Sequence, residues 1–182
     1  DLNLMLSSLK RIAVLCLYVC ASIYLADAQP KAAGTSYSFS SLGLTYEHTL
    51  NQECFISADI KTETGAFFID RKHRPGASVS VTGNFIIDTW TSRNGNTISA
   101  FAGPGVAAGM SYDFRKGDGY FFGLKGRLGI ECLFDRKVSL SICLAPVLGM
   151  HMMQVEEHLE MKYYRNGLIN AIIPEIGIKY LF

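Results

Sequence analysis

The chain has 182 residues, a formal net charge of +1 and a mean hydropathy of +0.19. The length suits a single domain, and the nearly balanced charge gives no electrostatic basis for binding nucleic acid or another polyanion. The hydropathy is too low for a helical membrane protein, whereas a β-barrel hides its apolar half in alternation.

Residues 1–28 have the pattern of an export signal. The basic pair Lys10-Arg11 precedes an apolar run from Ile12 to Leu25, and Ala26-Asp27-Ala28 matches the small-x-small cleavage rule. The run is shorter than the roughly 20 apolar residues of a transmembrane helix. We therefore expect an exported protein that is cut after Ala28, with residues 1–4 as an upstream artefact and residues 29–182 as one domain.

Beyond residue 29, apolar and polar residues alternate in stretches that are separated by turn residues. A two-residue period is typical of a β-strand with one apolar face. Asn94-Gly95 predicts a tight hairpin turn, and Pro104 predicts a bulge in its strand. We expect eight strands, over residues 36–50, 54–64, 77–92, 97–114, 120–134, 138–150, 152–164 and 168–182.

These stretches are longer than the strands of an average globular protein, which have about 5–6 residues. They are long enough for the about 9–11 residues that a tilted strand needs to cross a membrane. The sequence therefore predicts an all-β fold, an eight-stranded antiparallel up-and-down transmembrane β-barrel. If Phe182 is periplasmic, however, this strand count places the short turns at 94–95 and 135–137 on the external side, where long loops are usual.

The two faces of each expected strand differ in side-chain volume. One carries bulky apolar residues, and the other carries Gly, Ala, Ser and Thr with a few charges. An eight-stranded barrel has little interior space, so we expect the bulky face in lipid and the charges inside; in a soluble barrel the two faces would be exchanged. Buried charges must be paired, which predicts a lumen filled by a network of Glu47, Asp59, Lys61, Asp88, Lys125, Arg127, Glu131, Glu175 and Lys179.

The last expected strand ends in an unusual way. Its bulky parity continues to the C-terminus through Ile176, Ile178, Tyr180 and Phe182. A frayed, solvated chain end gains little from a terminal Phe, but an outer-membrane barrel has aromatic girdles at both membrane interfaces. This ending resembles the C-terminal assembly signal of bacterial outer-membrane barrels.

The signal-peptide pattern, the Gly-rich run GPGVAAGMSYDF and the closing PEIGIKYLF together resemble the small bacterial outer-membrane β-barrel domain family, of OmpA/OmpX-like type. The resemblance implies a Gram-negative outer membrane with its lipid and lipopolysaccharide, assembly by the barrel-assembly machinery, and a porin-like fold. It does not define the function, because members range from structural proteins to adhesins and enzymes. No peptidoglycan-binding domain is expected, since none follows Phe182.

Neither the cysteines nor the histidines indicate catalysis. Cys54, Cys132 and Cys143 are an odd number after the expected cleavage site, and the last two fall on opposite strand faces, so we expect three free thiols. No Cys/His spacing suggests zinc, and the sequence has no His-x-Ser pattern of the kind that a barrel hydrolase would need. We expect no metal, no cofactor and no catalytic residue.

The leading hypothesis is a monomeric, non-enzymatic outer-membrane barrel that acts structurally or through its loops. The basic link at 65–76 is expected to be a solvated loop, or a contact to lipopolysaccharide if it is external. The alternatives are a soluble exported lipocalin-like carrier of a small apolar ligand, and a barrel hydrolase.

Overall fold

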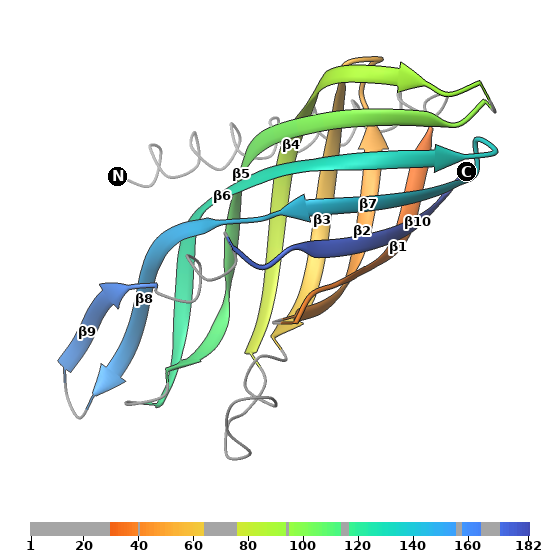
Figure 1. The fold of residues 1–182 in the computed structure, drawn as a ribbon. Helices are drawn as coiled ribbons and strands as arrows, with labels where there is room; N and C mark the ends of the chain where they lie inside the picture. The colour runs from red at the N-terminus through yellow and green to blue at the C-terminus, as the bar shows by residue number, and fades with distance from the viewer. Residues whose placement is uncertain are drawn as a thin grey trace, which may run out of the picture.

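The computed structural model describes residues 30–39, 41–63, 76–93, 95–113, 117–155, 158–164 and 172–182. The expected signal peptide and nearly all of the basic link at 65–76 lie outside these residues. Within them, no helix has the length and apolar character needed to cross a membrane. The described residues form a twisted antiparallel sheet that closes on itself (Figure 1).

The strands follow one another around the ring in chain order. The sheet order is β5-β4-β3-β2-β1-β10-β7-β6-β8-β9, and the pairing of β5 with β6 closes it. The bounds are β1 Lys31–Tyr37, β2 Ser41–Thr49, β3 Cys54–Glu63, β4 Gly76–Thr91, β5 Thr97–Asp113, β6 Gly117–Phe134, β7 Val138–Leu144, β8 Val147–Val155, β9 His158–Tyr163 and β10 Glu175–Leu181.

The ten segments fill eight strand positions. β7 and β8 both pair with β6, so they are one strand interrupted at Ala145-Pro146, where proline has no N–H to donate. On the other side of that strand, β10 pairs with β7 and β9 pairs with β8. β9 and β10 therefore share the eighth position, and the predicted eight-stranded antiparallel up-and-down barrel is confirmed.

The count was predicted correctly, but two of the predicted strands were wrong. Residues 36–50 are not one strand, because β1 ends at Tyr37 and a tight turn joins Ser38 to Ser41, with Ser38 N donating to Ser41 O at 2.8 Å. β1 itself (KAAGTSY) has few bulky residues, so its alternation is weak. Residues 152–164 are not a separate spanning strand, since they divide between the end of β8 and β9.

With these corrected strands, the short turns at 94–95 and 135–137 lie at the same end of the barrel as Phe182, and not at the opposite end as the predicted strands implied. Lys31 and Phe182 exchange backbone hydrogen bonds, with Phe182 N to Lys31 O at 2.8 Å, so the two ends of the barrel chain lie side by side. The turn at 135–137 lies beside them, because Leu181 N donates to Lys137 O at 2.7 Å. The hairpin turn at 92–96 lies at the same end, since β4 and β6 are both antiparallel to β5 and therefore end at the same end of the barrel. Figure 1 shows the C-terminus next to the β6–β7 turn.

The register shift in the sheet does not lie at Pro104, where the sequence predicted a bulge. β5 pairs with β6 residue for residue through Pro104, so the predicted bulge there is wrong. The register shifts instead in β4, between Ile86 and Asp88. An extra residue in one strand reverses its inward and outward parity from that point on.

Candidate functional site in the barrel interior

The barrel has its apolar side chains outside and its charged side chains inside. Lys125, Arg127 and Lys179 are each less than a tenth exposed, whereas Leu124 is 66% exposed. The exposed large apolar residues run around the ring and include Leu44, Ile60, Val79, Phe85, Ile130, Leu148, Ile178 and Phe182. Hydrophobic residues of a protein in water are normally inside, and charged residues are almost never buried unless they are paired.

Glu47 of β2 is the centre of the first cluster of buried charges. Arg127 Nη1 lies 3.0 Å from Glu47 Oε1, and Lys179 Nζ lies 2.5 Å from Glu47 Oε2. Lys179 also reaches Glu131 Oε2 at 3.0 Å. The Ser57 hydroxyl donates to Glu47 at 3.0 Å and accepts from Arg127 at 2.6 Å, so these charges are hydrogen-bonded as well as paired.

Asp59 of β3 is the centre of the second cluster. Lys125 Nζ, from β6, lies 2.7 Å from Asp59 Oδ2. The hydroxyls of Thr45 and Ser80 donate to the same carboxylate at 2.8 and 3.1 Å. Three donors from three strands thus satisfy one buried carboxylate, as a buried charge requires.

A third pair joins Lys61 of β3 to Glu175 at the start of β10. The thiol of Cys143 donates to the other carboxylate oxygen of Glu175, with Sγ 3.9 Å from Oε2. Cys54, Cys132 and Cys143 are all free thiols. In the part of the chain that the structure describes, no group of His, Cys, Asp or Glu could hold a metal ion.

The structure places eight of the nine predicted lumen residues in these pairs, and the ninth, Asp88, elsewhere. Asp88 is exposed and pairs in register with Ala100, on the outer face of β5. The β4 bulge causes this, because it turns Thr89 inward in the place of Asp88. The prediction for Asp88 was therefore wrong. The interior set is balanced, with the cations Lys61, Lys125, Arg127 and Lys179 and the carboxylates Glu47, Asp59, Glu131 and Glu175.

Two buried aromatic clusters flank the charges, and we did not predict them. Phe55 and Phe101 pack edge to face with ring centroids 5.5 Å apart, and the Arg127 guanidinium lies 5.2 Å from the Phe101 centroid. In the other cluster, Phe121 and Tyr164 stack in parallel at 4.2 Å. A signal was present in the sequence, since Phe101 and Phe121 share the parity of the small and charged residues of their own strands.

No protein-family model matches the sequence, and no curated protein matches it either. Among solved structures, the chain is similar to the crystal structure of the N-terminal β-barrel domain of Pseudomonas aeruginosa OprF. The TM-score is 0.52 at 9% sequence identity, and the match covers 85% of this chain and 96% of that one. At this identity the likeness is one of fold, and the chain has the fold of a small eight-stranded outer-membrane β-barrel of the OmpA-like type, as the resemblance of its sequence implied.

Proposed function

We propose that this protein is a non-enzymatic, integral outer-membrane β-barrel whose lumen is filled by its charged network, and that it acts structurally or through its loops. The observation that carries the proposal is the reversed distribution of side chains, with paired charges inside and a continuous apolar surface outside. In water, contiguous exposed apolar patches beyond a few hundred Å² are rare on a monomer. Hydrocarbon is the solvent that makes such a surface favourable.

The exposed aromatic residues support a membrane position for the wall. Tyr46, Trp90 and Tyr180 lie toward the end of the barrel that holds Lys31 and Phe182, and Tyr37 and Tyr120 lie toward the opposite end. Tyr and Trp are enriched at both membrane–water interfaces, because their rings are apolar and their polar groups need water.

The pairs that cross the barrel support a filled lumen. Arg127 comes from β6 and Glu47 from β2, which lie on opposite sides of the ring, so their contact at 3.0 Å spans the interior. Lys125 and Asp59 bridge β6 and β3 in the same way. An open water-filled pore would need these contacts to be broken, and each broken buried pair costs about 3–5 kcal/mol.

The soluble-carrier hypothesis has less support. A lipocalin-like carrier of an apolar ligand needs an apolar cavity within the barrel. Here the middle of the barrel holds the buried, paired charges of Glu47, Asp59, Lys125 and Arg127, which do not suit an apolar ligand.

Several parts of the proposal rest on the sequence. These are export by a signal peptide cut after Ala28, contact with membrane lipid and lipopolysaccharide, insertion by the barrel-assembly machinery through the C-terminal signal, and a monomeric state. The proposed signal residues Ile176, Ile178, Tyr180 and Phe182 are all exposed on the outer face, at 45–64% of their surface.

Membrane fractionation followed by an SDS gel of unboiled and boiled samples tests the location. We expect the protein in the detergent-soluble outer-membrane fraction, with a mobility that changes on boiling. A protein that stays in solution without detergent and shows no mobility change would end the membrane proposal. Recording in planar bilayers tests the lumen separately, and large, steady channels would contradict a filled interior.

A further inference from the structure

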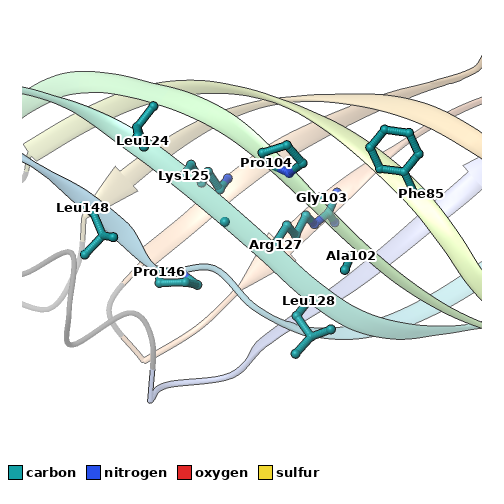
Figure 2. A pocket seen from close by; sticks show the side chains of 11 residues that line it. Phe85, Ala102, Gly103, Pro104, Leu124, Lys125, Arg127, Leu128, Pro146 and Leu148 are labelled. Carbon is teal, nitrogen blue, oxygen red and sulfur yellow. The ribbon is translucent and has the colours of Figure 1, made fainter.

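A groove of about 560 Å³ lies on the outer wall across β5, β6 and the β7–β8 junction. Figure 2 shows Pro104 and Pro146 on opposite sides of β6, and the groove is also lined by Leu124, Leu128 and Leu148. Gly126 lies between the two prolines, and a Cβ built on it would meet the Pro146 ring at 3.3 Å. Lys125 and Arg127 turn into the lumen, where they are paired, so the groove offers no free charge to a ligand.

The backbone beneath the groove has an acceptor that the sheet cannot satisfy. Gly126 N donates to Pro146 O at 2.9 Å. In an antiparallel ladder such a pair exchanges two bonds, but Pro146 has no N–H to return. The carbonyl oxygen of Gly126 is thus left without its ladder donor.

A second glycine and proline pair repeats this arrangement in the same row. The register of β4 and β5 places Gly83 opposite Pro104, and the paired residues skip Gly83 and Asn84. Pro104 cannot donate to Gly83, just as Pro146 cannot donate to Gly126. A Cβ built on Gly83 would meet nothing within 4 Å, so the outer side of this residue is open.

Hydrocarbon offers no hydrogen-bond donor to an unsatisfied backbone carbonyl, which is why spanning barrels satisfy their backbones internally. We propose that the groove binds a largely apolar molecule that carries a hydroxyl group, with the hydroxyl donating to the carbonyl of Gly126. The apolar lining contacts the hydrocarbon part of the ligand and disfavours a charged group. The carbonyl that lacks a ladder donor, because a proline stands opposite it, selects for a ligand with a hydrogen-bond donor. The inference rests on the proposed function, because the wall must lie in lipid for the carbonyl to lack water.

The chain permits a direct test, because Gly126-Arg127 is the only Gly-Arg step in the sequence. Labelling with ¹³C-carbonyl glycine and ¹⁵N arginine therefore gives one backbone carbonyl–nitrogen NMR signal, that of Gly126. The protein is reconstituted in phosphatidylcholine bilayers, and dodecanol with its hydroxyl at mid-chain is compared with dodecane. We expect dodecanol to move the Gly126 carbonyl resonance downfield in a saturable way and dodecane to leave it unchanged.

The variant Pro146→Ala restores a donor to Gly126. Its carbonyl resonance is expected to lie downfield already and not to respond to dodecanol. Ile60→Ala, on an outward apolar residue away from the groove, serves as the matched control and keeps the wild-type response.

Three results would overturn the inference: no response to dodecanol, the same response to dodecane, or a wild-type resonance that is already downfield and sensitive to D₂O, which would assign the site to water. Heat-dependent gel mobility is measured on each sample. An inserted barrel without a carbonyl response overturns only the groove ligand, whereas a chain that does not insert overturns the proposed function.

Discussion

Glu47 illustrates how a buried charge is tolerated inside this barrel. Its carboxylate meets Arg127 and Lys179 and also accepts from the hydroxyl of Ser57. Such a group is tolerated only while its partners remain, because without them its own buried charge would be uncompensated. The stability of each buried charge therefore depends on its partners on other strands.

Glu47→Gln should destabilise the folded barrel by about 3–5 kcal/mol, because it leaves Arg127 and Lys179 under-compensated. Glu160→Gln is the matched control: Glu160 lies 3.1 Å from Lys162 in a partly exposed pair, and its loss should cost about 0–1 kcal/mol. Urea unfolding in detergent micelles measures both. Equal losses in the free energy of unfolding for the two substitutions would contradict a stabilising role for the interior network.

The accessibility of the Asp88 side chain tests whether the β4 bulge turns it outward. In a background without the native cysteines, Asp88→Cys should react with a water-soluble maleimide in the folded protein, because Asp88 is exposed. Ser139→Cys is the control, since Ser139 is fully buried and should react only after unfolding. Mass spectrometry counts the labels. Protection of both positions would mean that Asp88 faces the lumen after all.

At the scale of the strands, glycines set how closely neighbouring backbones approach inside the barrel. Gly123 of β6 and Gly149 of β8 pair with each other. A Cβ on Gly123 would lie 2.6 Å from the Leu148 carbonyl oxygen, and one on Gly149 would lie 2.4 Å from that of Phe122. The sequence pattern places these glycines on the small face, and the paired structure explains why nothing larger fits.

Gly123→Ala should destabilise the barrel by about 1–3 kcal/mol, because the backbone must shift to admit the methyl group. Gly83→Ala is the contrasting substitution: its outward side is open, and replacing a strand glycine should stabilise by about 0.5–1 kcal/mol. The temperature at which unboiled protein loses its folded gel mobility reports both. A neutral Gly123→Ala would show that β6 and β8 are less closely packed than described.

For the whole molecule, the decisive question is which solvent surrounds the outer wall. Leu124 is 66% exposed near the middle of β6, and Tyr180 is 52% exposed near the end of β10. In water, an exposed leucine can become arginine at little cost. In a bilayer the cost depends on depth, and it is greatest at the midplane.

Leu124→Arg should therefore destabilise the protein in liposomes by about 2–4 kcal/mol, and Tyr180→Arg by about 0–1 kcal/mol beyond the lost aromatic contacts. Folding into liposomes as a function of urea concentration measures the difference. If both substitutions were neutral, the apolar face would not lie in hydrocarbon, and a soluble barrel would again become the better description.

The sequence by itself was sufficient for the fold class, the strand count and the choice of the inner face. These follow from a two-residue period and from side-chain volume, which are local properties: Leu124 and Lys125 are neighbours in the chain, and the pleat alone puts them on opposite faces. The same parity identified eight of the side chains that meet in the lumen. It could also have identified Phe101 and Phe121.

Only the tertiary structure decided which of these groups meet. Lys179 and Glu47 are 132 residues apart in sequence, and no pattern in the chain joins them. Their contact depends on the register of every pair of strands around the ring. Register is a long-range property, and so are the bulge that turns Asp88 outward and the division of the eighth strand between β9 and β10. Alternation determines which face of the sheet a residue occupies, whereas the register of the closed sheet determines which residues it contacts there.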